Sequence, residues 1–224
     1  MSAVRCLVLA SASPRRRALL ERLGVPFAVI PADVEEHLPT VAPRAERVAR
    51  ALARRKAVAV AAQVPPGTAV LAADTVVVLR GCILGKPADA DEAAAMLRAL
   101  RARQHRVITG VALAVGRRVR VTHAVTTVRM RAYGDDEIAA SIAAGTPFDK
   151  AGAYAIQDPD FRPVASYRGC YCNVVGLPLA PVITLLREAG VAVPDVDPAA
   201  LTPQCGACPL FAPVHAGAAR HASH

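Results

Sequence analysis

The chain has 224 residues, 54% of them hydrophobic, and a formal net charge of +9 at pH 7. This length and apolar content suffice for one sizeable core, in a single domain or two tightly joined lobes. No apolar run approaches the ~18 residues that a membrane span needs. We see no signal peptide, because polar residues follow the first ten at once. We therefore expect a soluble, cytoplasmic protein.

The positive charge by itself would suit nucleic-acid binding. Against this, the arginines are scattered, aromatic residues make up only 4% of the chain, and the sequence contains no recognition module. A basic protein equally suits a polyphosphate ligand. Only three of the 27 basic residues are lysines, Lys56, Lys86 and Lys150. In an arginine-rich chain a retained lysine indicates a need for a compact ammonium, with chance retention as the alternative.

The first half of the chain alternates expected strands and helices. An apolar run at 5–10 predicts a buried strand. Ser13 and Pro14 suit the N-cap and first turn of a helix that Gly24 closes. We then expect a strand at 27–31, a helix from 43 to about 63, a strand at 69–79, a turn at 80–81 and a helix from Asp89 to about 101.

The second half is dominated by two long strands, at 106–115 and 117–131, around a turn at Gly116. Helices are expected at 135–144 and 180–189. Alternating strands and helices with one long hairpin indicate a mixed α/β fold. From about residue 193 the chain is rich in Pro, Ala and His. We expect a domain at 1–192 and a loosely ordered C-terminal extension at 193–224.

The first candidate site is the segment SASPRR, between an expected strand and an expected helix. A helix N-terminus presents free backbone N–H groups and the positive end of the helix dipole, which suit a phosphate. Ser11 and Ser13 add hydroxyl groups, and Arg15 and Arg16 add guanidinium groups. Because cations are unfavourable in a first turn, these residues favour an anion site over an ordinary capped helix.

The second candidate is Asp74, a carboxylate inside an apolar strand. Such a group needs a cation, a metal or backbone N–H groups as partners, and a purely structural aspartate is the alternative. The loop residues Glu35 and Glu36 could be solvated, or could join Asp74 as oxygen ligands of Mg²⁺ or Mn²⁺. Lys56 and Lys86 could then neutralise charge on a transferring phosphoryl group. The sequence contains no P-loop, GxSxG, HExxH or GxGxxG motif.

The six cysteines fall into two groups. Two lie in apolar runs and are expected in the core, Cys6 and Cys82. The other four form two close pairs, Cys170 with Cys172 and Cys205 with Cys208. Three interpretations of these pairs remain open: four thiolates around a structural zinc, a redox-labile disulfide, or unconnected thiols.

Together these segments resemble the Maf family of nucleotide pyrophosphatases. The resemblance rests on LVLASASPRRRALLERLGV, VEE, LARRKA, AADTVVVL, ILGKP, VITGVAL, DKAGAYAIQ and NVVGLPL, in the family's order over about residues 4–190. It implies a Maf/ITPase-like α/β fold, with an elongated, curved mixed sheet flanked by helices and a cleft between two lobes. It also implies a divalent cation, cleavage between the α- and β-phosphates, and a homodimer.

The resemblance also implies roles for individual residues. Asp74 matches the family's proton acceptor, although it could serve chiefly as a metal ligand. Further positions match phosphate- and metal-handling residues of the family: Ser11, Arg16, Glu36, Lys56 and Lys86.

Three positions that differ between family branches carry Arg15, Thr75 and Gln157, a combination that resembles the dTTP/UTP branch. We therefore expect hydrolysis of dTTP and UTP to the monophosphate and pyrophosphate. The alternatives are 7-methyl-GTP or other modified nucleotides as substrate, or a non-catalytic regulator of cell division. The segment DPDFRP after Gln157, the cysteine pairs and the C-terminal extension depart from the family pattern.

Overall fold

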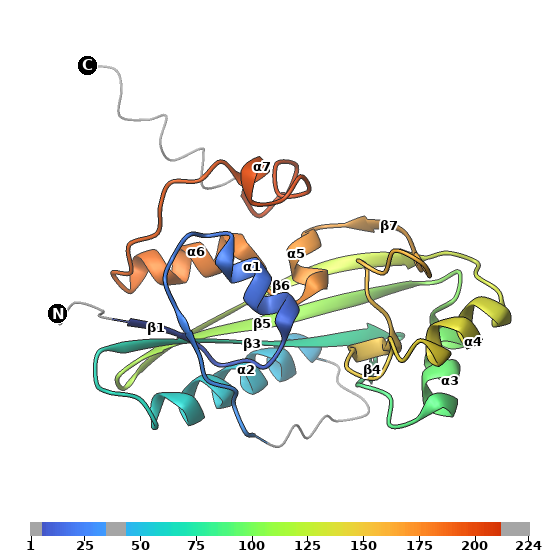
Figure 1. Ribbon diagram of the computed structural model, residues 1–224, viewed down its shortest axis with the longest axis horizontal. Helices are drawn as coiled ribbons and strands as arrows, with labels where there is room; N and C mark the ends of the chain where they lie inside the picture. The colour runs from blue at the N-terminus through green and yellow to red at the C-terminus, as the bar shows by residue number, and fades with distance from the viewer. Residues whose placement is uncertain (1–5, 35–43, 212–224) are drawn as a thin grey trace, which may run out of the picture.

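The computed structural model describes residues 6–34 and 44–211, and its centre is a seven-stranded sheet (Figure 1). The strand order is β2-β1-β3-β5-β6-β7, and β4 pairs with β3 beside this path. The strands are β1 (Cys6–Leu9), β2 (Ala28–Val29), β3 (Thr68–Leu79), β4 (Cys82–Leu84), β5 (Gln104–Val115), β6 (Arg118–Met130) and β7 (Val164–Arg168). Because β1 pairs in parallel with β2 and β3 while the other pairs are antiparallel, the expected mixed sheet is confirmed.

Helices cover both faces of the sheet. They are α1 (Pro14–Glu21), α2 (Ala45–Ala61), α3 (Ala90–Leu100), α4 (Asp135–Ala143), the 3-10 turn η1 (Ala151–Ala153), α5 (Tyr171–Val175), α6 (Leu179–Glu188) and α7 (Pro198–Leu201). Figure 1 shows α2 on one face, α1, α5 and α6 on the other, and α3 and α4 at one end. The predicted N-caps are confirmed: Ser13 accepts from the Arg16 N–H at 3.4 Å, and Asp89 from the Glu92 N–H at 2.8 Å.

A glycine lets α2 approach the sheet closely. A Cβ atom on Gly110 of β5 would lie 2.3 Å from the carbonyl oxygen of Ala49 on α2, so any side chain there would collide with helix backbone. Gly110 stands opposite Asp74 in the β3–β5 ladder. The close crossing therefore brings α2, which carries Lys56, against the part of β3 that carries Asp74.

The apolar core divides along the sheet into separate clusters. One contains Leu20 of α1, Leu71 of β3 and Leu186 of α6. Another, at the end covered by α3 and α4, contains Leu97 and Tyr133. The three longest strands, β3, β5 and β6, run through both regions, and the resulting shape is elongated (Figure 1). We refer to these two regions as the two lobes.

The expectation of a loosely ordered extension is wrong for residues 193–211, and residues 212–224 lie outside the described part of the chain. The segment forms α7 and packs Leu201 and Phe211 into the same core cluster as α1 and α6. Arg22 of α1 also donates a hydrogen bond to the carbonyl oxygen of Leu201 at 2.7 Å. A few apolar side chains at suitable spacing are enough to dock a segment whose composition otherwise indicates a loop.

Other local predictions also needed correction. Cys6 and Cys82 are exposed rather than in the core, because each begins a strand and faces outward there. The segments β4, η1, β7, α5 and α7 were not predicted; each has five residues or fewer, too short for a periodic pattern to show. Within the described ranges, no helix combines the length and apolar character that crossing a membrane requires.

Candidate active site

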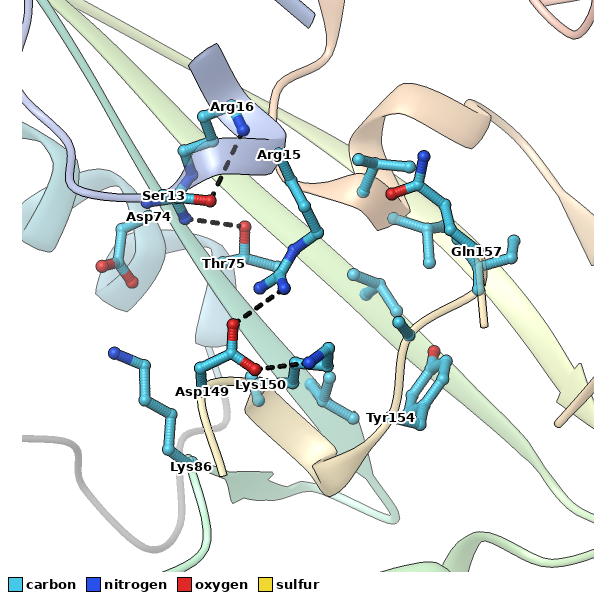
Figure 2. Close-up of a pocket in the computed structure, with 18 of the residues that line it drawn as sticks. Ser13, Arg15, Arg16, Asp74, Thr75, Lys86, Asp149, Lys150, Tyr154 and Gln157 are labelled. Atoms are coloured by element: carbon cyan, nitrogen blue, oxygen red, sulfur yellow. Dashed lines mark hydrogen bonds and ion pairs between the residues drawn. The ribbon is translucent and has the colours of Figure 1, made fainter. Parts of the chain in front are cut away.

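A cleft that is open to solvent lies where the two lobes meet (Figure 2). One wall comes from the start of α1, from β3 and from α5. The other comes from the segment after β4 and from η1 with the residues that flank it. Eight of the predicted site residues line this cleft: Ser13, Arg15, Arg16, Lys56, Asp74, Thr75, Lys86 and Gln157.

All three lysines of the chain also line the cleft: Lys56 from α2, Lys86 from the segment after β4, and Lys150 just before η1. Chance retention would not bring three lysines from separate parts of the sequence to one cavity. Their placement therefore agrees with the inference that a lysine retained in an arginine-rich chain serves a need for a compact ammonium. Glu36, the other predicted metal ligand, lies outside the described residues.

Asp74 and Lys56 form a buried ion pair at the bottom of the cleft. The Nζ atom of Lys56 lies 2.5 Å from Oδ1 of Asp74. The two residues are only 8% and 4% exposed, so both charges are largely removed from bulk water. An ion pair in such surroundings keeps the carboxylate in its charged form. A negative charge is thus fixed in the apolar strand β3, at a place where ligand can reach it.

Arg16 is held against the cleft wall by three hydrogen bonds. Its Nε donates to the carbonyl oxygen of Gly176 at 2.9 Å, Nη2 to the Thr75 hydroxyl at 3.2 Å, and Nη1 to the Ser11 hydroxyl at 3.4 Å. Ser11 is buried and does not line the cleft; its hydroxyl also accepts from the Ser13 N–H at 3.2 Å. Ser11 therefore supports the site from behind. Thr75 lies 2.9 Å from the Thr109 hydroxyl, so its own hydroxyl is already engaged.

A second charged group, missed in the sequence, lies across the cleft from Asp74. Arg15 Nη1 contacts Asp149 Oδ2 at 2.8 Å, and Asp149 also pairs with Lys150. Burial alone would raise the pKa of Asp149, but the hydrogen bonds from Lys150 and Arg15 hold it below its ordinary value. In Figure 2, Arg15 reaches toward Asp149 from the α1 side. The pair joins the two lobes across the cleft mouth.

The far end of the cleft carries Gln157, which is exposed. Gln157 also lines a second, neighbouring hollow together with Tyr171 at the start of α5. Tyr154 lines the same part of the wall, and behind it the buried His105 contacts the Tyr154 hydroxyl through Nε2 at 2.6 Å. Asp149, Lys150 and Tyr154 all belong to the segment DKAGAYAIQ, which could have indicated them before the structure did.

The four paired cysteines come together in space, as one of the three open interpretations requires. Cys172 Sγ lies 3.4 Å from Cys205 Sγ, and all four cysteines belong to the same buried cluster. All four are buried and none forms a disulfide. Within residues 6–34 and 44–211, no three His, Cys, Asp or Glu side chains already stand in an arrangement that could hold a metal ion.

The family model described as Maf-like protein matches residues 6–189. A dTTP/UTP pyrophosphatase of Thermomicrobium roseum is 63% identical over 204 residues, covering 91% of this chain and 93% of the relative. A dTTP/UTP pyrophosphatase of Pelotomaculum thermopropionicum is 47% identical over 82% of this chain and 96% of its own length.

A solved structure, the nucleoside-triphosphatase / dITP/XTP pyrophosphatase of Mycobacterium abscessus, covers 82% of this chain and 95% of its own, with 15% identity and a TM-score of 0.40. The family match spans both lobes, the cleft between them and each segment that supplies a charged residue to it. On that match and on the identity to the curated relatives, the chain belongs to the Maf family.

Proposed function

We propose that this protein is a cytoplasmic nucleoside triphosphate pyrophosphatase that hydrolyses dTTP and UTP to the monophosphate and pyrophosphate. The observation that carries the proposal is a buried carboxylate, Asp74, in a cleft that is otherwise rich in cations. The names of the two curated relatives support the choice of substrates.

The triphosphate binds among the cations of the cleft. The N-terminal turn of α1, with the N–H groups after Ser13, lies on one side, and Lys86 and Lys150 lie on the other. Arg16 is held rigidly by its hydrogen bonds to Gly176 and Thr75, so its charge is already in place before the ligand arrives. Arg15 is shared with Asp149 and closes the mouth of the cleft.

Asp74 acts as the general base. It accepts a proton from a water molecule, the water oxygen forms a bond to the α-phosphorus, and the bond from that phosphorus to the bridging oxygen breaks. Pyrophosphate leaves with the bonding electrons. The ion pair with Lys56 keeps Asp74 charged and ready to accept the proton. Lys86 neutralises the charge that develops on the departing phosphates.

A divalent cation, Mg²⁺ or Mn²⁺, belongs to this proposal. The donor chemistry fits: these ions prefer carboxylate and phosphate oxygens and need few protein ligands when phosphates take part. Asp74 supplies one carboxylate from the described part of the cleft, and Glu36 is the second ligand that we propose. The cation would supply additional positive charge to the phosphates.

Base selection rests chiefly on Gln157. Thr75 is occupied by Arg16 and Thr109, and Arg15 by Asp149, so these two residues shape and brace the site. The amide of Gln157 is exposed at the end of the cleft. An amide offers both a donor and an acceptor, which match the carbonyl and imide groups of thymine and uracil.

Pyrophosphate release with dTTP, UTP, CTP, ATP, GTP and 7-methyl-GTP, in Mg²⁺ and in Mn²⁺, tests the proposal. We expect kcat/KM for dTTP and UTP to exceed that for the purine nucleotides by roughly 10- to 100-fold. A preference for 7-methyl-GTP or another modified nucleotide would replace the proposed substrates. Release of no pyrophosphate from any of them would favour a regulatory, non-catalytic protein.

We also propose a homodimer. Within the described residues, Val125 of β6 and Tyr167 of β7 are large apolar side chains exposed near one edge of the sheet, where a second copy could cover them. Light scattering on the purified protein tests this, and a monomeric mass at micromolar concentration would reject it.

A further inference from the structure

The four clustered cysteines come from two segments that are far apart in sequence. Cys170 and Cys172 stand at the start of α5, and Cys205 and Cys208 follow α7 in the C-terminal extension. They are 1%, 0%, 1% and 5% exposed, respectively. All four belong to one core cluster, in which the Sγ atoms of Cys172 and Cys205 are in contact. Thiols are otherwise mediocre hydrogen-bonding groups, so nothing in ordinary core packing calls for four of them together.

The distance between neighbouring Sγ atoms is closer to that of thiolates bound to one metal ion than to that of a disulfide bond. Cys172 and Cys205 are separated by 3.4 Å between Sγ atoms, whereas a disulfide bond measures about 2 Å. In a tetrahedral zinc site with Zn–S bonds of about 2.3 Å, neighbouring sulfurs lie about 3.8 Å apart. In their present positions no three of the four thiols form a group that could hold a metal ion. Rotation of one cysteine about its Cα–Cβ bond moves the sulfur by roughly 3 Å, which is enough to complete such a tetrahedron.

We propose that Cys170, Cys172, Cys205 and Cys208 form a structural zinc site that fastens the C-terminal extension to the body of the protein. Four thiolates complete the coordination of a structural zinc, and the thiol protons pass to solvent as the metal binds. No electron transfer is involved. The second pair has the Cys-x-x-Cys spacing common in such sites.

The proposed zinc site lies next to the end of the cleft that carries Gln157, where we propose that the nucleotide base binds. The second hollow, beside the cleft, is lined by Gln157 and by Tyr171, which lies between the first two cysteines. Arg15 of the cleft and Thr202 and Gln204 of the extension line the same hollow. Fixing α5 and the extension with one metal ion therefore positions Gln157. This consequence rests on the proposed function, whereas zinc binding itself does not.

Metal content is the direct test. Protein purified without added metal is analysed by inductively coupled plasma mass spectrometry, and we expect ~1 zinc per chain. The double variant Cys205→Ser/Cys208→Ser should lose that zinc. The matched control Cys6→Ser/Cys82→Ser alters the two exposed cysteines outside the cluster and should keep it. Zinc below ~0.2 per chain, or zinc retained by the cluster variant, would overturn the proposal.

Two measurements on the unaltered protein keep the test valid if the double variant does not fold. Titration with a mercurial reagent should release zinc in step with the reaction of four buried thiols. Mass spectrometry without reducing agent should find no disulfide among them. Release of no zinc during the titration, or a disulfide within the set, would overturn the site.

The effect that we propose for the zinc ion on the position of Gln157 is measured separately, by the kinetics of dTTP hydrolysis. In zinc-depleted but folded protein, KM for dTTP should rise about 3- to 10-fold with kcat little changed, because Gln157 loses its fixed position. An unchanged KM would remove the positioning role and leave the zinc result untouched. If the protein hydrolyses no nucleotide at all, zinc content still decides whether the site exists.

Discussion

The cleft and the thiol cluster lie at the two ends of α5 but are built in opposite ways. Val174 and Val175 face the cleft, while Cys170 and Cys172 belong to the cluster. The side chains of Arg15 and Asp149 in the cleft are 26% and 58% exposed, whereas no thiol of the cluster exceeds 5%. A site that exchanges its ligand at each turnover must leave its charges accessible. A site that holds its ligand permanently is more stable when sealed.

Because of this difference in exposure, we expect substitutions in the cleft and in the thiol cluster to affect different properties of the protein. Charged residues of the cleft contribute to binding and chemistry, and the two exposed ones, Lys86 and Asp149, add little to folding stability. Buried groups around α5 contribute to stability and position. The ion pair between Asp74 and Lys56 is the exception, since it lies in the cleft but is as buried as the thiols.

The largest effect on activity is expected at the ion pair between Asp74 and Lys56. Asp74→Asn should lower kcat at least ~100-fold, the scale of losing a general base. The amide keeps the shape and an acceptor oxygen for Lys56, so the fold should survive. Steady-state pyrophosphate release together with circular dichroism checks both parts. The control Asp91→Asn removes an exposed carboxylate on α3. Near-normal turnover of a folded Asp74→Asn protein would eliminate the proposed role.

The next largest effect on activity is expected at Lys86, whose substitution tests the role of the accessible charges in the cleft. Lys86→Ala should lower kcat/KM about 10- to 100-fold, because one phosphate-neutralising charge is lost, and should leave the melting temperature unchanged because Lys86 is exposed. Lys86→Arg should restore little, since a planar fork replaces a compact ammonium. Arg98→Ala on α3 is the control. A fully active Lys86→Arg would show that any cation suffices there.

The cleft was largely predictable from the sequence because its parts are local. Ser13 with Arg16, and Asp74 with Thr75, each stand in a short segment whose composition conflicts with its expected surroundings: cations in a first helical turn, a carboxylate in an apolar strand. Lys86 was indicated instead as one of only three lysines in an arginine-rich chain. Such conflicts indicate a ligand wherever the fold places them. Asp149 gave no such conflict, because an exposed aspartate beside a lysine in a loop is ordinary.

The thiol cluster and the order of the extension could not be predicted in the same way. The contacts of Cys172 with Cys205 and of Arg22 with Leu201 join segments that are 33 and 179 residues apart. Local composition carries no information about such pairings. The close crossing at Gly110 is similar: the sequence shows a glycine in a strand, but only the packing of α2 explains it.

A sealed group next to the cleft yields a pH prediction. Burial lowers the pKa of His105 to about 4 from its ordinary 6.5, and its Nδ1 has no hydrogen-bond partner within the described residues. Because the unfolded chain then binds more protons between pH 6.5 and 4, stability is fully present above 6.5 and falls with pH through that window. At about 1.4 kcal/mol per unit, lowering the pH from 6.5 to 5 should cost about 2 kcal/mol.

Urea unfolding at pH 7 and pH 5 measures this loss. His105→Gln removes the titrating group and keeps an amide near the Tyr154 hydroxyl, so its loss over the same interval should be smaller by about 2 kcal/mol. His123→Gln, at a half-buried histidine on β6, should behave as the unaltered protein. Equal losses in all three proteins would show that His105 is not the group responsible.

The smallest effect is expected at Gln157, whose exposed amide lines the cleft and the hollow that Tyr171 also lines. In Gln157→Glu a carboxylate replaces the amide, and the donor that a pyrimidine carbonyl requires is lost. A mismatched hydrogen bond costs about 1 to 3 kcal/mol, so kcat/KM for dTTP should fall about 10-fold relative to GTP, whose base edge is rich in donors. Gln204→Glu, at a residue of the extension that lines the second hollow together with Gln157, is the matched control. Equal ratios for Gln157→Glu and the unaltered protein would mean that the cleft walls select the base by size alone.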